Sequence, residues 1–428
     1  MLKASLYHII KYILVFVLTA ALCASLLVCS ALIPSNAVRD NTLRSAQFFQ
    51  DNGIFYDRIE GVPASRVDNY ADTITVDIGW CFDENDPFKS TMLAEYYTTE
   101  TENVRDSFSK GLLDSGYDRS EYLRYWHGSA AVSRIMHQFT DISGMRVCAA
   151  VIMILLAAAL LTVLIMNRLY AEAVCSVLAL ISVSVWFVPE AIQNVWCFII
   201  MLAVSPICAM FAIRNKYEQI CTILLISGVV TNFFDFLTTE TLTLLFPLIL
   251  VISIKRRTGG KLRDDMMYAV KCCALWLCGY CFMWVLKWIC AAAVLGTDVM
   301  PFVGEHISER MYDRGDSGLI PFIAEMFMRN TGCLFPAGYN EPGIIGAVLL
   351  VLGFCFYIFV FRKKGWDKGT IAIFLLLGAV VFMRYLVLHN HSHGHYFFTY
   401  RAQASAVLAV LLSAAEFTGV RVKNGKKT

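Results

Sequence analysis

The strongest constraint on this chain is a series of long apolar runs. A backbone inside lipid must satisfy its own hydrogen bonds, and an α-helix needs about 20 apolar residues to cross a bilayer. Ten runs are candidates for such helices: 12–32, 147–166, 171–188, 195–213, 220–236, 241–254, 269–295, 343–361, 370–388 and 402–419. The sequence therefore predicts an all-α fold, a polytopic transmembrane helical bundle of about ten spans.

Composition agrees with a lipid environment. The chain is 57% hydrophobic and 16% charged, whereas soluble domains carry roughly 25% charged residues. A net charge of +2 excludes the strongly basic class of nucleic-acid binders. The bilayer is the expected partner and nucleic acid is not. Most of the 15 cysteines lie in apolar runs, where a thiol behaves as a small hydrophobic group, so no zinc or redox site is predicted.

Orientation follows from the short connections, because Lys and Arg accumulate on the cytoplasmic side of membrane proteins. Basic residues occupy alternate connections: Lys3, Lys11, Arg168, Arg214, Lys216, 255–257, Lys261, Arg263, 362–364, Lys368, Arg421, Lys423, Lys426 and Lys427. Both termini of this multi-pass protein are therefore predicted to be cytoplasmic. Runs 220–236 and 241–254 form either two spans or one re-entrant hairpin, and both alternatives return Lys255 to the cytoplasm.

Two polar segments are too long to be simple turns. Residues 34–146 follow the first span (1–33) and predict a large, mostly helical extracytoplasmic domain, with helix-like stretches at 41–51 and 91–106. Residues 297–341 predict a second extracytoplasmic loop. It separates the transmembrane helices of 147–296 from the C-terminal helices and cytoplasmic tail of 342–428.

Acidic residues of the first long loop are candidates for a general base, which needs a carboxylate within reach of the proton that it removes. Asp72 and Asp77 are the candidate catalytic residues, and Trp80 lies nearby in the sequence. Asp72 is preferred because it follows Tyr70 and precedes the β-branched run 73–76, which indicates a fixed position. The alternative is that these are solvated loop acids.

Two further motifs place polar groups beside aromatic rings. Tyr125, Trp126 and His127 precede the second span and are candidates for substrate binding, although an interfacial aromatic belt is the alternative. His127 is harder to explain by anchoring alone. Asp235 interrupts an apolar stretch, and a carboxylate at membrane depth usually faces a cavity or a partner.

Histidines alternate at 389, 391, 393 and 395 after the ninth run. Alternation places side chains on one face only in an extended segment, so a tetrahedral metal site is not implied and the metal requirement stays unknown. We expect His391, His395, Arg384 and Arg401 to bind a donor phosphate, because arginine offers a two-pronged contact to phosphate. A pH-sensitive structural network is the alternative.

Taken together, the outward acidic loop, the aromatic belt with His127, Asp235 between two spans and the His/Arg cluster before the last span resemble the polytopic glycosyltransferases of the GT-C superfamily. The resemblance is one of architecture over most of the chain, and its motifs are short. The chain is also similar to Gram-positive membrane proteins that share the Tyr-Trp-His-Gly, Phe-Asp-Phe-Leu-Thr and Phe-Thr-Tyr-Arg elements.

The resemblance implies an inverting glycosyltransferase of the bacterial plasma membrane, with a polyprenyl-phosphate sugar donor, a cell-envelope acceptor and a first-loop acid as base. Such enzymes often carry adjacent acids in that loop. Asp72 has no acidic neighbour, and the adjacent pair Asp83 and Glu84 comes later, so the identity of the base stays open. A divalent cation as cofactor also stays open. The alternatives are a polysaccharide polymerase or ligase, and a transporter or flippase of lipid-linked glycans.

Overall fold

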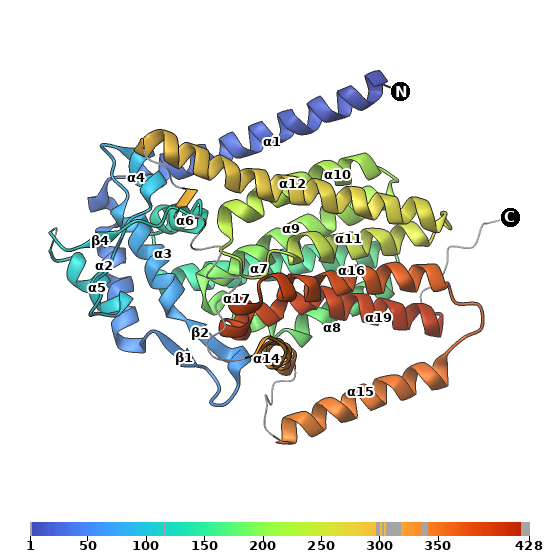
Figure 1. The fold of residues 1–428 in the computed structure, drawn as a ribbon. Helices are drawn as coiled ribbons and strands as arrows, with labels where there is room; N and C mark the ends of the chain where they lie inside the picture. The colour runs from blue at the N-terminus through green and yellow to red at the C-terminus, as the bar shows by residue number, and fades with distance from the viewer. Residues whose placement is uncertain are drawn as a thin grey trace.

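The computed structural model describes residues 2–114, 116–296, 300, 301, 304, 318–334 and 341–420. The protein is mostly helical, so the predicted helical membrane protein is confirmed at that level. A bundle of long helices carries a small domain of short helices and strands at one end (Figure 1).

The bundle contains helices at all ten of the predicted runs. They are α1 (Leu2–Ala31), α7 (Ile142–Met166), α8 (Tyr170–Ser182), α9 (Ile192–Ile213), α10 (Tyr217–Phe234), α11 (Leu242–Arg256), α12 (Leu262–Leu295), α15 (Glu341–Phe361), α16 (Lys368–Val387) and α19 (Ala404–Thr418). Within the described residues, seven helices are long and apolar enough to cross a membrane, and α8, α11 and α15 are not among the seven. Length and composition thus support a multi-pass membrane protein.

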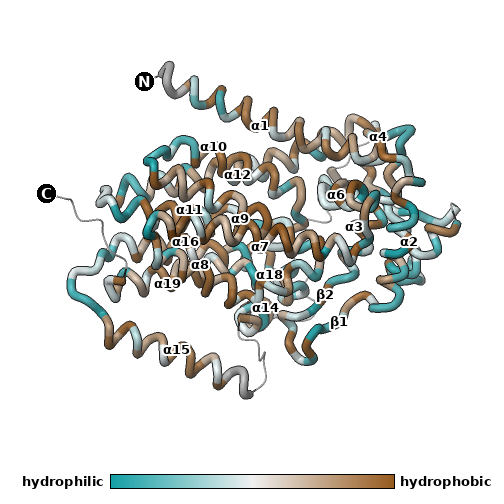
Figure 2. The backbone as a smooth tube through the Cα atoms, turned by 180° about the vertical axis from the view of Figure 1, so that it is seen from behind, coloured by the Kyte–Doolittle hydropathy of each residue, from teal (hydrophilic) through white to brown (hydrophobic). Residues whose placement is uncertain are grey.

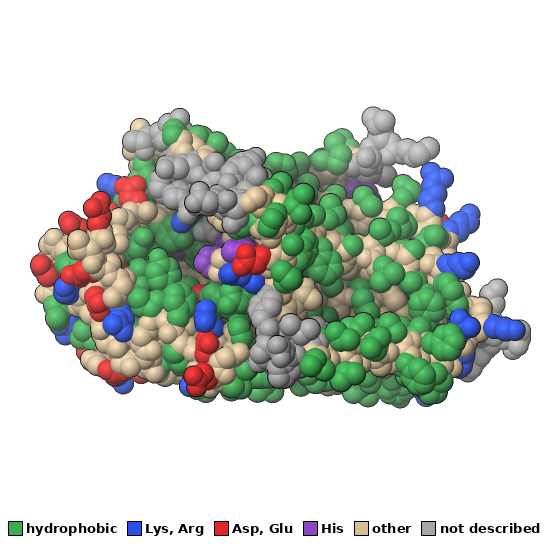
Figure 3. Space-filling model, turned by 60° about the horizontal axis from the view of Figure 1, so that its bottom comes forward, with side chains coloured by type: hydrophobic (Ala, Val, Ile, Leu, Met, Phe, Trp, Pro, Cys, Tyr) green, Lys and Arg blue, Asp and Glu red, His purple; other side chains and the backbone are tan. Residues whose placement is uncertain are grey.

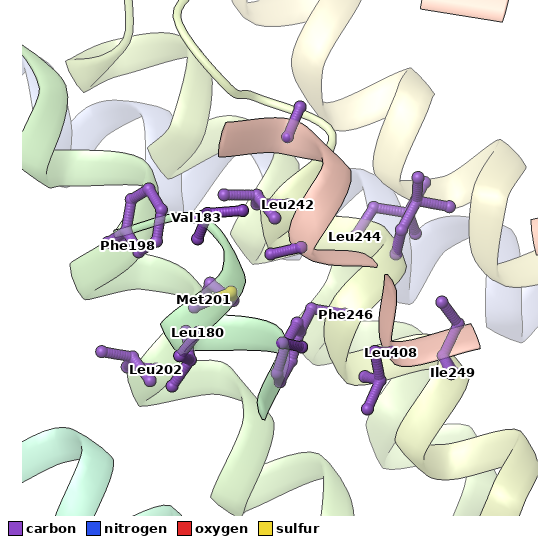
Figure 4. Close-up of a cluster of buried hydrophobic side chains, with 14 of the residues drawn as sticks. Leu180, Val183, Phe198, Met201, Leu202, Leu242, Leu244, Phe246, Ile249 and Leu408 are labelled. Atoms are coloured by element: carbon purple, nitrogen blue, oxygen red, sulfur yellow. The ribbon is translucent and has the colours of Figure 1, made fainter. Parts of the chain in front are cut away.

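The core of the bundle lies around α11. This helix is buried around its whole circumference, as expected for a helix that is apolar on every face. Phe246 of α11 lies near Leu180 of α8, and Ile249 of α11 lies near Leu408 of α19 (Figure 4). Apolar residues run along the bundle helices and polar residues gather at its two ends (Figure 2).

Ion pairs join the short basic connections at the end of the bundle farther from the small domain. Arg257 pairs with Glu172, and Arg256 lies 2.6 Å from Asp367. These contacts bring the connections after α7, α11 and α15 together, and the last residues of α19 lie at the same end as the start of α1 (Figure 1). On one face, hydrophobic side chains separate this basic end from an end with charges of both signs (Figure 3). The gathering of basic residues at one end matches the predicted alternation.

The small domain between α1 and α7, called the cap domain here, follows in chain order. It comprises α2 (Ser35–Asn52), β1 (Phe55–Asp57), η1 (Pro63–Ser65), β2 (Arg66–Asp68), α3 (Asn69–Cys81), α4 (Pro87–Leu93), β3 (Tyr96–Tyr97), α5 (Val104–Gly111), β4 (Arg119–Ser120) and α6 (Gly128–Met136). Strand β1 pairs antiparallel with β2, and β3 pairs antiparallel with β4. Helix α2 contains the predicted stretch 41–51.

The prediction of a helix at 91–106 is wrong. Helix α4 ends where Ala94 adopts a left-handed conformation with φ +50°, which an α-helix of L-residues cannot continue. Strand β3 follows, and α5 begins only at Val104. Pairing of β3 with β4 therefore overrides the local helical preference of this stretch.

Short helices close the capped end of the bundle. They are η2 (Val185–Glu190), α14 (Leu319–Gly332), α17 (His389–Gly394), α18 (Tyr396–Thr399) and η3 (Tyr400–Gln403). Asn330 of α14 donates to the Ser392 carbonyl at 2.9 Å and accepts from the Thr399 hydroxyl at 2.7 Å. Helix α14 is thereby fixed against the histidine segment, and most of the predicted loop 297–341 lies outside the described residues.

Candidate functional site

A cavity of about 440 Å³ lies where the cap domain meets the bundle, and we call it the junction cavity. It is lined by Phe55, Asp68, Tyr70, Ala71, Ile74, Thr75, Ile78, Tyr96, Tyr122, Arg124, His127, Gln193, Phe236, Thr238, His391, His395 and Phe398. These residues come from segments far apart in the sequence, and the cavity lies at the end of the bundle away from the basic connections. Ring faces with a few polar groups are typical of a small-molecule site.

Among the described residues that line the cavity, Asp68 is the one carboxylate. It ends β2 and caps α3, because its Oδ1 accepts from the backbone N–H of Ala71 at 3.0 Å. Only 4% of the residue is exposed, and burial raises the pKa of its carboxyl to about 7. Asp68, Ala71, Thr75 and Ile78 follow the helical spacing that places them on one face of α3.

The segment before α6 contributes a cation and an imidazole to the cavity lining, in contrast to the carboxylate of Asp68. Arg124 lies over the Tyr122 ring at 4.7 Å, an arrangement in which the ring face attracts the cation. The backbone of His127 is left-handed (φ +60°), and its Nε2 lies 2.8 Å from the Tyr122 carbonyl oxygen. Because a carbonyl oxygen only accepts, Nε2 carries the hydrogen. Burial, with the charge of Lys287, lowers the pKa of His127 to about 3, so its imidazole is neutral.

The four alternating histidines do not form one row, because the segment is helical. In α17 residues four apart share a face, so the row divides into two pairs. The rings of His391 and His395 lie 4.7 Å apart beside the cavity. His389 and His393 turn toward α14, where Phe322 stacks on His393 at 4.2 Å. Of the four histidines, only His391 and His395 are available to a ligand in the cavity.

A tight turn at 235–240 forms one wall of the cavity. Asp235 accepts from the Thr238 backbone N–H at 3.1 Å, and Leu237 is left-handed with φ +64°. The Leu237 carbonyl accepts from His391 Nε2 at 2.8 Å and from the Arg384 guanidinium. Arg384 also pairs with Glu240 at 2.9 Å. Asp235 and Arg384 therefore stabilise the turn that forms this wall, although neither side chain lines the cavity.

The two predicted catalytic acids lie on other faces of α3. Asp72 is unexposed and lies 2.7 Å from Arg146. It also accepts from the backbone N–H groups of Ile192 and Gln193 at 3.1 and 3.0 Å. Asp77 accepts from the Tyr97 N–H at 2.9 Å, and burial raises the pKa of its carboxyl. Neither acid lines the junction cavity.

Three other predicted residues also support the site from outside. Arg401 is buried and donates to the Ala64 carbonyl at 3.0 Å. The Tyr125 ring packs 4.8 Å from that of Phe236. The Trp126 indole donates to the Met283 carbonyl at 2.8 Å. Of the predicted residues, the cavity brings together His127, His391 and His395.

Sequence reasoning did not select Asp68, Gln193 or Arg124 as site residues. One signal was available for Asp68, because an aspartate directly before a helix is a strong N-cap. Gln193 accepts from the Thr75 hydroxyl at 2.8 Å, a contact across 118 residues of sequence that no local pattern indicates.

Among the described residues, no three His, Cys, Asp or Glu side chains come together in a way that would hold a metal ion. Comparison with protein families, with curated proteins and with solved structures finds no match for this chain. The chemistry of the junction cavity therefore carries the functional argument.

Proposed function

We propose that the protein is a membrane glycosyltransferase. It moves a sugar from a polyprenyl-phosphate donor to an extracytoplasmic cell-envelope acceptor, with the reaction in the junction cavity. The observation that carries this proposal is the cavity itself, in which a carboxylate with a pKa of about 7 shares a ring-lined space with Arg124 and three histidines. The GT-C resemblance supplies the donor class.

In this reaction Asp68 takes the proton of an acceptor hydroxyl. The hydroxyl oxygen attacks the anomeric carbon, and the bond from that carbon to the phosphate oxygen breaks with its electron pair going to the lipid phosphate. A base is most effective when its pKa lies near the working pH. Asp68 meets that condition, whereas the Arg146 ion pair and two backbone N–H groups occupy Asp72.

The leaving phosphate gains negative charge as the bond breaks. A cation already in place at the start of the reaction stabilises such charge without reorganisation. Arg124 is the charged candidate within the cavity lining. His391 and His395 line the same cavity.

The membrane arrangement belongs to the same proposal. Ten bundle helices cross the bilayer, the basic connections face the cytoplasm and the cap domain faces outward, as the distribution of Lys and Arg indicates. The donor lipid then reaches the cavity from the outer leaflet.

The test uses the full chain in vesicles with a panel of polyprenyl-phosphate hexoses and pentoses and of lipid-linked oligosaccharides, all labelled in the sugar. Asp68→Asn is the decisive variant, because asparagine keeps the N-cap of α3 but is not a base. Transfer should fall by a factor of about 10² to 10⁴. Asp40→Asn, at an exposed position of α2, is the matched control. Undiminished transfer by Asp68→Asn, or transfer only from lipid-linked oligosaccharides, would overturn the proposal.

A further inference from the structure

A second cavity, of about 250 Å³, lies on the outer side of the bundle where α7 meets α2 and η2. We propose that it binds the head group of a membrane phospholipid through the phosphate. We call it the head-group pocket. This proposal does not rest on the transferase activity. Asp72 does not line the junction cavity, and it pairs with Arg146, which lines the head-group pocket.

The position of the pocket suits a head group. Val147 and Trp186 line it and are 63% and 54% exposed. Further along α7, Ile154 and Leu155 are 67% and 64% exposed, so the apolar surface of this helix continues away from the cap domain. Tryptophan is enriched where apolar surface meets the head-group region. The pocket therefore opens at the boundary between the lipid-facing helix and the polar cap.

Arg146 supplies the specific contact. Its side chain is 7% exposed, and its Nη2 donates to Asn69 and to Asp72, each at 2.7 Å. Its Nε and Nη1 are buried and have no hydrogen-bond partner in the described part of the chain. A buried donor without an acceptor is costly. Nε and Nη1 lie on different edges of the guanidinium, so a phosphate in the pocket would accept a charge-assisted hydrogen bond from one of these two donors.

The remaining polar groups of the pocket suit a phosphate. Ser143 is exposed and adds a hydroxyl donor one turn before Arg146. Arg58 lies 2.7 Å from Glu190, so the carboxylate on the rim already has a cation beside it. The guanidinium of Arg146 packs on the Phe48 ring at 5.2 Å, which limits its movement. A phosphate would thus meet a fixed cation, a hydroxyl and an apolar approach for the attached acyl chains.

The experiment measures lipid binding to the purified, delipidated full chain by native mass spectrometry and by the shift in unfolding temperature. The probes are phosphatidylglycerol, phosphatidylethanolamine, diacylglycerol and inorganic phosphate. Both phospholipids should bind and raise the unfolding temperature. Diacylglycerol lacks the phosphate and inorganic phosphate lacks the acyl chains, so each should bind at least about tenfold more weakly, the loss of one charge-assisted contact or of the lipid anchor.

The variant that tests the location is Ser143→Glu, which places a carboxylate on the pocket wall without touching the Asp72 pair. Phospholipid affinity should fall about tenfold through repulsion of the phosphate. Gln138→Glu adds the same charge at an exposed position outside the pocket lining and should bind as the parent does. Arg146→Lys keeps the charge near Asp72 but loses the additional N–H donors of the guanidinium, and should also weaken binding.

Three results would overturn the proposal. Equal phospholipid affinity in Ser143→Glu and Gln138→Glu would move the lipid elsewhere. Equal binding of diacylglycerol would show that the phosphate is not recognised. Binding of inorganic phosphate as tightly as the phospholipids would make the pocket a free-anion site.

Discussion

Asp68 caps α3 and Asp72 lies one turn later in that helix, yet the two acids have different surroundings. Asp68 lines the junction cavity and is bound at Oδ1 by the Ala71 N–H. Asp72 is enclosed, with Arg146 at 2.7 Å and two backbone N–H groups of α9 on its oxygens. The first carboxylate is placed for proton transfer, and the second joins three segments of the chain.

The two acids should therefore respond differently to the same change. Asp72→Asn leaves Arg146 buried without its counter-charge, and breaking a buried pair in this way costs about 3 to 5 kcal/mol. We expect a large fall in unfolding temperature in detergent, with transfer lost because the protein unfolds. Asp68→Asn should keep the unfolding temperature within a few degrees and lose transfer.

The control for this comparison is the activity of whatever Asp72→Asn remains folded at low temperature. If that folded fraction has lost transfer while Asp68→Asn retains it, the base is Asp72, as the sequence alone had suggested.

This pair also shows what a single sequence can and cannot predict. The composition of 34–146 indicated that an acid of the first loop would be important, and Asp72 looked well fixed because of the run 73–76. It is well fixed, but by Arg146 and α9. The surroundings that distinguish Asp68 come from residues 124, 193, 236 and 391, and such long-range packing leaves no trace in the local sequence.

The rate of transfer should depend on the ionisation of Asp68. Burial raises the pKa of this carboxyl to about 7, so the base is protonated in acid. Below about pH 7 the rate should fall roughly tenfold for each pH unit, and above it the rate should level off. A pH profile that is flat between 5 and 8 would contradict this assignment.

The same group should influence stability. Asp68 binds a proton more tightly in the folded state (pKa about 7) than in the unfolded chain (about 4). Its contribution to the free energy of unfolding is therefore most favourable at low pH and is lost as the pH rises from about 4 to about 7. Asp68→Asn removes this dependence. Unfolding temperatures of parent and variant should converge near pH 4 and separate toward pH 7, with the variant higher.

Arg124 and Arg401 separate a phosphate contact from a structural one. Arg124 lines the cavity, whereas Arg401 donates to the Ala64 carbonyl outside it. Arg124→Lys loses the planar fork and should raise the donor KM about tenfold, the effect of one charge-assisted contact. Arg401→Lys should leave the donor KM unchanged. Kinetics at limiting donor decide between them, and the opposite pattern would return the phosphate role to Arg401.

The helices of the bundle were predictable because lipid imposes one simple rule on every span. All ten predicted runs contain bundle helices, although α11 is buried on every side and too short to count as a span by length. The arrangement of the histidines was not predictable. Alternation at 389–395 says nothing about faces until the backbone is known, and a single helical turn divides His391 and His395 from His389 and His393.

The orientation of the bundle is open to a direct test. Reporters fused after Arg257 and after Lys364 should read as cytoplasmic, because the connections that carry them share the basic end. A reporter inserted at Gly116, in the loop between α5 and β4 of the cap domain, should read as external. Reversal of all three signals would place the junction cavity on the cytoplasmic side and exclude an extracytoplasmic acceptor.

The buried pair of Arg384 and Glu240 gives the last prediction. Their 2.9 Å contact lies outside the cavity lining. Arg384 also donates to the Leu237 carbonyl, which accepts a second hydrogen bond from His391. Glu240→Gln removes the carboxylate that contacts the buried guanidinium and should cost about 3 to 5 kcal/mol. The double change Arg384→Met with Glu240→Gln removes both charges. It should be less destabilising than Glu240→Gln alone, because a buried ion pair replaced by neutral groups is often tolerated.

A double-mutant cycle on the free energy of unfolding measures this coupling. Transfer gives the second readout. If the pair only stabilises the fold, the double variant recovers activity together with stability. If it also positions the Leu237 carbonyl for His391, stability returns while the donor KM stays high, because the Arg384 contact to that carbonyl is still missing. Purely additive single changes would show that the two charges are already screened from each other and would contradict their assignment as a buried pair.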